Sequence, residues 1–214
     1  MKDFDLSVKR FDEFADQYAK RYENLEDYTD SIDAFCHLIR TDKPKILELG
    51  CGPGNVTKLL KIRFAESQIT AIDLAPNMIA IARKHLPDVD FKLMDVRDIL
   101  SLPEQFDAVM CSFCLPFLST KDAQKLISDC AELLHQGGVI YICTMEGNES
   151  DAGFEATSFS GEAKIYFNYH AQQDIQDAFV TSGFEIQFFK LQDYREMDGR
   201  ISTSDMIFIG LKSD

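Results

Sequence analysis

The segment ILELGCGPGNVTKLL (46–60) carries an acid and three glycines at two-residue intervals: Glu48, Gly50, Gly52 and Gly54. Glycine is required where a backbone turns sharply or lies directly against a ligand, because a Cβ would clash there. The helix expected after the last glycine begins with unpaired N–H groups and a partial positive charge. This segment therefore predicts a strand–helix turn that holds part of a small molecule.

Two carboxylates follow this loop near the predicted ends of the next two strands. Asp73 lies 23 residues after Gly50, and Asp95 ends the strand after that. A mononucleotide-binding unit places an acid about 20 residues beyond its glycines, where the carboxylate accepts hydrogen bonds from ribose hydroxyls. We therefore expect Asp73 to hold a ribose.

The spacing of the glycines distinguishes between two kinds of ligand. The dinucleotide pattern G-x-G-x-x-G would need a third glycine at position 55, which is Asn55. A pyrophosphate would also be repelled by Glu48 and Asp95, whereas a ligand that carries an ammonium and a sulfonium would not. A tight turn that binds nothing is the remaining alternative, and the two carboxylates at successive strand ends argue against it.

The segments around the loop alternate between strand and helix patterns. Short apolar runs indicate strands, and apolar residues at three- and four-residue steps indicate helices. This alternation predicts a parallel sheet joined by right-handed crossovers. The expected strands are 45–49, 68–73, 89–95, 106–113 and 139–145, and the expected helices are 54–64, 76–85 and 120–135, the last stopped by Gln136, Gly137 and Gly138.

Both ends of the chain depart from this alternation. Two helices are expected within residues 9–40, and a loop or hairpin arm at 147–161 precedes an extended segment at 163–170. A helix is expected at 171–182, and the strands 184–191 and 204–211, joined by the charged residues 193–200, predict an antiparallel hairpin that closes the sheet. We divide the single domain into an N-terminal helical lid (1–42), a cofactor-binding core (43–146), an insertion or lid (147–170) and a sheet-closing helix and hairpin (171–214).

These motifs resemble those of the class I S-adenosylmethionine-dependent methyltransferases over roughly residues 44–145. ILELGCGPGNVT matches the family's first motif, ITAIDLAPNMIAIAR the second, FKLMDVRDI the third, and FDAVMCSFCLPFL and LLHQGGVIYI the fourth and fifth. The resemblance implies an α/β, Rossmann-like fold with a seven-stranded sheet, mostly parallel, whose last strand is reversed. It also implies S-adenosyl-L-methionine as cofactor and methyl transfer to a small-molecule acceptor.

The resemblance also implies roles for individual residues. Asp73 would hold the ribose, and Leu74 would lie against the adenine. Asp95 would accept a hydrogen bond from the adenine amino group, and Val96 would offer a backbone contact.

The N-terminal segment FDEFADQYA (11–19) resembles an opening in which a tyrosine, here Tyr18, helps to close over the cofactor. Tyr18 fits the apolar face of its own helix equally well. The full set of cofactor-binding residues that we expect is Tyr18, Glu48, Gly50, Cys51, Gly52, Gly54, Asp73, Leu74, Met78, Asp95, Val96, Cys111 and Phe113, with no metal ligand.

The acceptor is expected beyond the carboxyl ends of the strands, because open α/β sheets bind ligands there. The segments available are 111–118, Met145, Glu146 and the N-terminal helices. The apolar stretch SFCLPFL favours a small, partly apolar acceptor, and it lacks the signature of nitrogen-directed nucleic-acid methyltransferases. Many small-molecule relatives have a histidine where Pro116 stands, so one candidate base is absent. The catalytic residue stays unknown, with Tyr166, Tyr169 and His170 as weak candidates and Tyr28 in the N-terminal cap equally ambiguous.

The composition limits the partners and the location of the protein. Its 214 residues carry 22 basic and 36 acidic side chains, a net charge of -14, which repels phosphate backbones and anionic lipid. No apolar run approaches the ~20 residues of a membrane span, and the first residues do not resemble a secretion signal. We expect a cytoplasmic monomer or homodimer with no nucleic-acid or membrane partner. The six cysteines are expected to be reduced, and the single CxxC pair to be neither a metal site nor a redox motif.

Three other functions stay open at this point. A NAD-dependent oxidoreductase fits the fold class but lacks the third glycine of the dinucleotide pattern. A non-catalytic S-adenosylmethionine-binding protein fits the absence of an evident base. A protein methyltransferase with a basic partner fits the net charge of -14.

Overall fold

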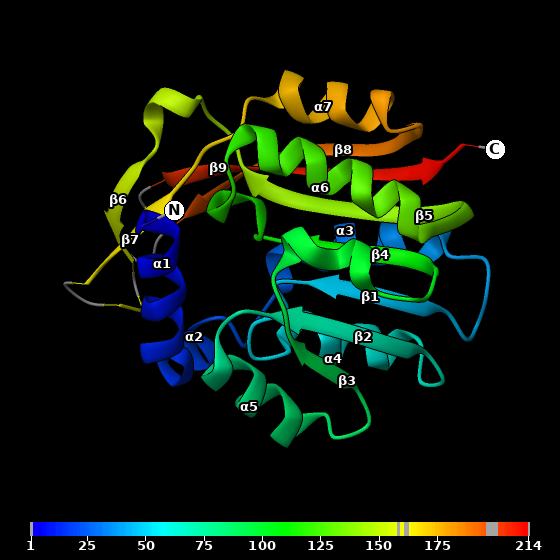
Figure 1. Ribbon diagram of the computed structural model, residues 1–214, viewed down its shortest axis with the longest axis horizontal. Helices are drawn as coiled ribbons and strands as arrows, with labels where there is room; N and C mark the ends of the chain where they lie inside the picture. The colour runs from blue at the N-terminus through cyan, green and yellow to red at the C-terminus, as the bar shows by residue number, and fades with distance from the viewer. Residues whose placement is uncertain (1, 158, 161–162, 196–200, 214) are drawn as a thin grey trace.

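The computed structural model describes residues 2–157, 159–160, 163–195 and 201–213. Its centre is a seven-stranded sheet of order β3-β2-β1-β4-β5-β9-β8 (Figure 1). The strands from β3 to β5 pair in parallel, and β9 runs antiparallel to both β5 and β8. The predicted fold, with its C-terminal antiparallel hairpin, is thereby confirmed. The strands are β1 (Lys45–Leu49), β2 (Gln68–Asp73), β3 (Asp90–Leu93), β4 (Phe106–Ser112), β5 (Leu134–Met145), β8 (Phe184–Arg195) and β9 (Ile201–Lys212).

Helices cover both faces of this sheet (Figure 1). Consecutive strand residues alternate between two hydrophobic cores, so that Ile46 faces one layer of helices and Leu47 faces the other. Strands buried on both sides need continuous apolar runs, which is why the sequence pattern identified them. One layer holds α3 (Glu26–Leu38), α4 (Asn55–Arg63) and α5 (Pro76–His85), and the other holds the 3-10 helix η1 (Val96–Ser101), α6 (Thr120–Leu133) and α7 (Gln172–Thr181).

The glycines at the end of α6 have a different role from the predicted one. The helix ends at Leu133, and β5 begins at the next residue, so that Gly137 and Gly138 lie inside the strand. The pairing of β4 with β5 shifts register there, because Phe106 pairs with Leu134 and Ala108 with Val139, so that three extra residues of β5 form an irregular, extended bulge. Gly137 has a φ of +72°, and a Cβ on Gly138 would lie 2.8 Å from the His135 carbonyl oxygen. The two glycines therefore shape a bulge and do not stop the helix.

The N-terminal region consists of three helices and does not behave as one lid. The first two are α1 (Lys2–Glu13) and α2 (Ala15–Arg21), with Phe14 between them. The third, α3, belongs to the core, because Phe35 is fully buried and its ring packs edge-on against Tyr141 of β5. We therefore propose α1 and α2 as the candidate lid, and the division of the chain near residue 42 stays a prediction.

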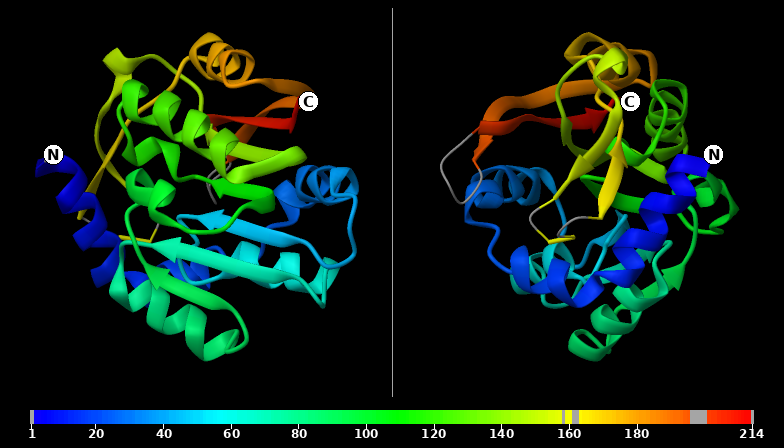
Figure 2. Two further views of the ribbon diagram at one scale, coloured as in Figure 1. Left: turned by 45° about the vertical axis from the view of Figure 1, so that its right-hand side comes forward. Right: turned by 90° about the vertical axis from the view of Figure 1, so that its left-hand side faces the viewer.

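The insertion after β5 forms a small antiparallel sheet. It contains the 3-10 helix η3 (Glu149–Asp151), β6 (Gly153–Ala156) and β7 (Lys164–Phe167). Figure 2 shows this pair beside α1 at one end of the large sheet. Ser7 of α1 ties the two together, because its hydroxyl donates to the Tyr166 carbonyl and accepts from the Tyr166 N–H, both at 3.1 Å. Both elements lie at the carboxyl ends of β1 and β2, whose arrows point toward them in Figure 1.

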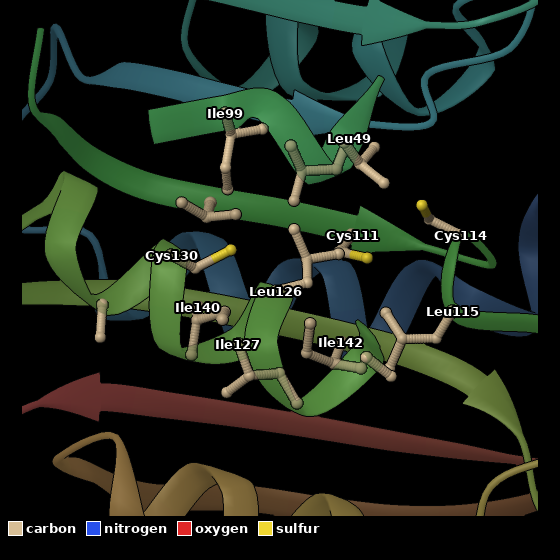
Figure 3. Packing of buried hydrophobic residues seen from close by; sticks show 14 of the residues in the cluster. Leu49, Ile99, Cys111, Cys114, Leu115, Leu126, Ile127, Cys130, Ile140 and Ile142 are labelled. Carbon is tan, nitrogen blue, oxygen red and sulfur yellow. The ribbon is translucent and has the colours of Figure 1, made fainter. Parts of the chain in front are cut away.

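The six cysteines are all free and buried. Figure 3 shows Cys111 and Cys114, at the end of β4, facing the side chains of Leu126 and Cys130 on α6. They serve as small apolar residues of the core, and burial raises the pKa of the Cys130 thiol. Among the described residues, no helix is long and apolar enough to cross a membrane.

Candidate functional site

A cavity of about 370 Å³ opens at the carboxyl edge of the sheet. Its walls come from α1, α2, the start of α3, the loop after β1, the ends of β2 and β4, β6 and the start of β9. This is the edge at which open α/β sheets bind ligands. Ten of the predicted cofactor residues line the cavity: Tyr18, Glu48, Gly50, Cys51, Gly52, Asp73, Leu74, Met78, Val96 and Phe113.

The glycine loop lies against this cavity in a left-handed backbone conformation. Gly50 has a φ of +65° and Gly52 a φ of +52°, values that other residues adopt only with strain. A Cβ on Gly50 would lie 3.1 Å from Cβ of Cys114, whereas a Cβ on Gly52 would meet Tyr18 only at 3.8 Å. Gly50 is therefore required for packing, and Gly52 for an open backbone surface beside the cavity.

Helix α4 begins directly after the loop and presents its N-terminus to the site. Its N-cap is Gly54, which has no side chain to satisfy the first N–H groups of the helix. The neighbouring Asn55 donates from Nδ2 to the Tyr22 carbonyl at 2.7 Å, which fixes α2 beside the loop. The helix N-terminus thus contributes a partial positive charge to the wall.

Glu48 contributes an unpaired buried oxygen. The residue is 2% exposed, and its Oε2 has no hydrogen-bond partner among the residues that the structure describes. Burial raises the pKa of Glu48 to about 8, and the neighbouring Thr57 offsets part of this shift. A carboxylate in this position can be satisfied by a cationic ligand group, as its position in the glycine motif suggested.

Asp73 joins the end of β2 to the glycine loop. Its Oδ2 accepts from the Gly52 N–H and its Oδ1 from the Ala75 N–H, both at 2.8 Å. Burial raises the pKa of Asp73, although these N–H donors act in the opposite direction. Each oxygen keeps lone pairs for a further donor, so the carboxylate can accept from a ligand without leaving the loop.

Three predicted cofactor residues lie outside the cavity wall. Gly54 lies where the start of α4 packs closely against α5, because a Cβ there would lie 3.3 Å from Cβ of Ala82 on α5. Asp95 caps η1 through the Arg97 N–H at 2.9 Å and forms an ion pair with the Arg97 side chain at 2.5 Å. Cys111 is fully buried on the α6 side of the sheet (Figure 3). The flanking Met94 and Val96, and Ser112 and Phe113, reach the cavity instead.

None of the three weak catalytic candidates lines the cavity. His170 is fully buried, and its Nε2 hydrogen-bonds the Leu115 carbonyl oxygen at 2.8 Å. Tyr169 donates its hydroxyl to Glu155 at 2.6 Å, and the Tyr166 ring packs within the β6–β7 pair. These residues hold the insertion against the domain, so their side chains are committed to structural contacts.

A group of five rings covers the cavity, and we call it the aromatic cover. Tyr18 of α2 and Tyr22, which follows α2, have ring centroids 4.7 Å apart, and Tyr18 lies 5.0 Å from Phe159 of the insertion. Phe11 of α1 lies 5.0 Å from Phe117, which follows β4. The aromatic cover thus joins the N-terminal helices, the insertion and the β4 segment. Tyr18 was predicted here, whereas its four partners were not singled out.

A buried pair of polar side chains lies on another wall of the cavity. Asp205, at the start of β9, is 1% exposed and accepts from the Tyr28 hydroxyl at 2.6 Å. The Thr203 hydroxyl donates to its other oxygen at 3.3 Å. Burial raises the pKa of Asp205 to about 6, although both hydroxyls stabilise its charged form. Phe113 packs edge-on against Tyr28, with ring centroids 5.5 Å apart.

The sequence also indicated that Asp205 lies at the ligand edge, although the residues next to it do not show this by themselves. A reversed last strand begins at the edge where the parallel strands end, and here Asp205 lies opposite Met145, the last residue of β5. A charged residue at the start of that strand, directly before the apolar run MIFIGL, therefore belongs at the ligand edge. The resemblance had already implied the reversal, so this placement was available from the sequence.

Comparison with known proteins agrees with this geometry. The model of the methyltransferase domain family matches residues 46–138, which contain the glycine loop, Asp73 and β4. The chain thus carries a methyltransferase domain over these residues. The matched segment contains β2, β3, β4 and most of the cavity's loop wall. The Tyr28–Asp205 pair and the rings of the aromatic cover other than Phe117 lie outside it.

Two curated methyltransferases illustrate the relationship. A trans-aconitate 2-methyltransferase of Escherichia coli (strain 55989 / EAEC) is 40% identical over 179 residues, which are 76% of this chain and 65% of that protein. A ubiquinone biosynthesis O-methyltransferase of Xanthomonas campestris pv. campestris (strain B100) is 35% identical over 115 residues, or 51% and 46% of the two chains. The chain thus spans less than two thirds of the length of these relatives.

The fold also agrees with that of solved structures. The magnesium protoporphyrin IX methyltransferase of Synechocystis PCC 6803, solved with bound S-adenosylmethionine, superposes with a TM-score of 0.73. The two chains are 16% identical, and the superposition covers 100% of this chain and 98% of that one. At this identity the likeness establishes the shared architecture alone.

Proposed function

We propose that the protein transfers the methyl group of S-adenosylmethionine to a small-molecule acceptor. The observation that carries this proposal is the convergence of the open glycine backbone at Gly52, the Asp73 carboxylate and the unpaired Glu48 oxygen on one cavity. These groups match a ligand with ribose hydroxyls and a cationic end. A pyrophosphate fits poorly, because the two carboxylates would repel it.

The residues of the cavity fit this cofactor in three ways. Asp73 would accept from the ribose hydroxyls, and Glu48 would hold a cationic group in place of its missing partner. Leu74, Met78 and Val96 supply an apolar wall for the adenine. Asp95 stays a predicted contact of the adenine amino group, and its ion pair with Arg97 would have to open for that role.

When bound, the cofactor supplies an electrophilic methyl group and most of the driving force. The chain's contribution is to hold the acceptor in line with that methyl and to exclude water. Such positioning can supply on the order of 7–11 kcal/mol of the barrier. The aromatic cover closes the cavity from three segments of the chain, which makes it the water-excluding element.

The alternatives are less well supported. A dinucleotide would need a glycine at Asn55, and the Asn55 side chain is bonded to the Tyr22 carbonyl. A protein substrate would have to pass the aromatic cover, whose rings are in mutual contact. A binding protein without catalysis has the same cofactor wall, so only turnover distinguishes it from an enzyme. We further infer a cytoplasmic monomer or homodimer, which light scattering after gel filtration would measure.

The proposal is tested by binding and turnover together. Calorimetry with S-adenosylmethionine, S-adenosylhomocysteine and NADH should show binding of the first two and none of NADH. A metabolite extract incubated with a donor that carries a deuterated methyl group should yield a labelled product, detected by mass spectrometry. Binding of NADH without binding of the methyl donor would overturn the proposal. Donor binding without any labelled product would support the non-catalytic alternative instead.

A further inference from the structure

The wall that contains Tyr28 and Asp205 has no assigned ligand. Its members come from α3, the end of β4 and the start of β9, none of which belongs to the glycine loop or to β2. The glycine loop and the end of β2 are taken by the cofactor. This second wall, on which Phe113 is the one residue also expected at the cofactor, is left for the acceptor. Its chemistry therefore indicates which acceptor the cavity takes.

Asp205 is a buried carboxylate without a cation. Its partners in the described part of the chain are two hydroxyls, Tyr28 and Thr203, and it forms no ion pair there. A buried charge is costly unless a cation or several strong donors balance it. The hydroxyls supply two hydrogen bonds but no charge, so a positively charged ligand would remove most of this cost.

Acidic side chains outnumber basic ones around the cavity. Among the described residues that line it, five are acidic and Arg21 alone is basic, and of the five Glu48 is protonated near pH 7 because its pKa is raised to about 8. The Arg21 guanidinium donates to the Tyr194 hydroxyl at 2.9 Å. An acceptor that carries several carboxylates would therefore enter a cavity of its own charge. The acidic residues are Asp27, Glu48, Asp73, Glu155 and Asp205.

Aromatic rings beside Asp205 offer a surface for the body of an organic cation. Phe113 has a φ of +58°, an uncommon conformation for a bulky residue, and its N–H donates to the Cys143 carbonyl at 2.9 Å. This backbone holds the Phe113 ring edge-on against Tyr28, at the cavity. Strained residues of this kind concentrate at ligand sites, and aromatic faces attract ammonium groups.

We propose that the acceptor is an amine with an apolar body, bound as an ammonium ion by Asp205 beside the rings of Tyr28 and Phe113. This inference rests on the proposed function, because it names the acceptor of the same cavity. It differs from what the names of the relatives suggest, since trans-aconitate is a polycarboxylate and ubiquinone biosynthesis is named for O-methylation.

The transfer balances with the groups that are present. The ammonium gives one proton to the Asp205 carboxylate, which frees the nitrogen lone pair. That lone pair forms the N–C bond while the methyl C–S bond breaks, and the electrons of the broken bond stay on sulfur. The product leaves as a methylated ammonium ion, and the proton on Asp205 passes to solvent.

The ionisation of Asp205 agrees with this role. With its pKa raised to about 6, the carboxylate is charged at neutral pH and is a stronger base than an exposed aspartate. In the part of the chain that the structure describes, the other titratable groups that face it have raised pKa values and are neutral near pH 7, so none of them is a competing cation. These groups are Tyr28, Tyr141, Cys143 and Tyr169.

The test compares three probes of similar shape but different charge: 2-phenylethylamine, 2-phenylethanol and 3-phenylpropionate. Each is titrated calorimetrically, near neutral pH, into the protein saturated with S-adenosylhomocysteine. The amine should bind tighter than the alcohol by roughly tenfold or more, the range expected of a charge-assisted hydrogen bond, and the carboxylate most weakly. Equal binding of the three, tightest binding of the carboxylate or no binding of the amine would overturn the proposal.

A substitution tests whether Asp205 itself, and not the rest of the fold, gives the cavity its preference for the amine. In Asp205→Asn the amine should lose its advantage over the alcohol, while the affinity for S-adenosylhomocysteine stays within about twofold. The matched control is Asp129→Asn, because Asp129 is also buried but pairs with Lys125 on α6, away from the cavity. Asp129→Asn should keep the ranking. An Asp205→Asn protein that still prefers the amine would overturn the assignment.

The two proposals fail in different ways. If the protein does not bind the methyl donor at all, the proposed function is wrong. If the donor binds and the labelled methyl group is found on an oxygen of the product, the proposed methyl transfer is supported and the amine inference is wrong. Label on nitrogen supports both.

Discussion

The Gly52 N–H donates to Oδ2 of Asp73 across 2.8 Å, so that the glycine loop and the end of β2 form one unit. The same carboxylate that would hold the ribose therefore also fixes the backbone that lies under the ligand. A change at either residue disturbs the other, and a change at Asp73 acts on the site in two ways.

Asp73→Ala should weaken the binding of S-adenosylmethionine by roughly 2–3 kcal/mol, the cost of unpaired donors plus a lost charged hydrogen bond. The Gly52 and Ala75 N–H groups would also lose their acceptor. Calorimetry measures the change, with Asp129→Asn as the control for a carboxylate outside the cavity. An unchanged affinity would remove Asp73 from the site.

Gly52→Ala tests whether the loop backbone lies against a ligand. The φ of +52° costs an alanine roughly 1–2 kcal/mol of stability, and its methyl group would also project into the open space beside Tyr18. Gly137→Ala is the matched control, because its φ is +72° and no atom lies within 4 Å of the added Cβ. Both variants should lose similar stability in urea, but only Gly52→Ala should bind the methyl donor more weakly. Equal binding by the two variants would contradict the model of the loop.

Glu48 should make the ligand-free protein less stable as the pH rises. Its pKa is about 8 in the folded state and about 4.5 in the unfolded chain, so between these values the native state holds a proton that the unfolded state releases. The free energy of unfolding therefore falls through this window, by at most on the order of 5 kcal/mol. Urea titrations at several pH values measure this slope.

Glu48→Gln should flatten that dependence and stabilise the ligand-free protein above about pH 8, because the amide has no charge to bury. The same variant should bind S-adenosylmethionine more weakly, by roughly tenfold, since it removes the charge that faces the cationic group. A pH slope equal to that of the unchanged protein would assign the slope to other groups.

Deletion of residues 1–22 should leave a folded sheet that releases the cofactor faster. It removes α1 and α2, and with them Phe11, Tyr18 and Tyr22 of the aromatic cover. Stopped-flow measurements should show the dissociation rate rising by roughly tenfold, as expected for the loss of a closing element. A truncated protein with an unchanged dissociation rate would show that these helices do not act as a lid.

Phe35→Ala provides the contrast to that deletion. Phe35 lies in α3, is fully buried and packs against Tyr141. Removing its ring should cost about 3–5 kcal/mol of unfolding free energy, as for other large-to-small core changes. The affinity for the methyl donor should stay within a few-fold in the fraction that remains folded. A small change in the free energy of unfolding would indicate that α3 belongs to the lid and not to the core.

The local sequence patterns predicted the strands of the large sheet well and the residues of the aromatic cover poorly. The bounds of β1, β2 and α5 agree with prediction, because apolar runs, a turn glycine and Pro76 each mark an element end. The role of Gly137 and Gly138 was wrong, since a bulge depends on the pairing partner and not on the segment itself. Part of the predicted 193–200 connection is strand, and residues 196–200 lie outside the described residues.

The same contrast holds in the candidate site, between residues that are close in the sequence and residues that are far apart. The glycine loop and Asp73 follow one another at fixed spacing, so their meeting was predictable. Tyr28 and Asp205 meet across 177 positions of sequence, and no local pattern links two such residues. The sequence did not indicate that Arg97 pairs with Asp95 outside the cavity wall, and the adenine contact of Asp95 stays a prediction.

One wall of the cavity comes from a continuous stretch of the sequence, and another comes from segments that are far apart in the sequence. The cofactor residues from Glu48 to Val96 lie in a single stretch, whereas Phe11, Tyr28, Phe159 and Asp205 come from four places along the chain. Insertions or point changes in those four places can reshape what enters the cavity without disturbing how the methyl donor is gripped. Relatives of this chain can thus diverge in the molecules they modify while the donor-binding stretch stays intact.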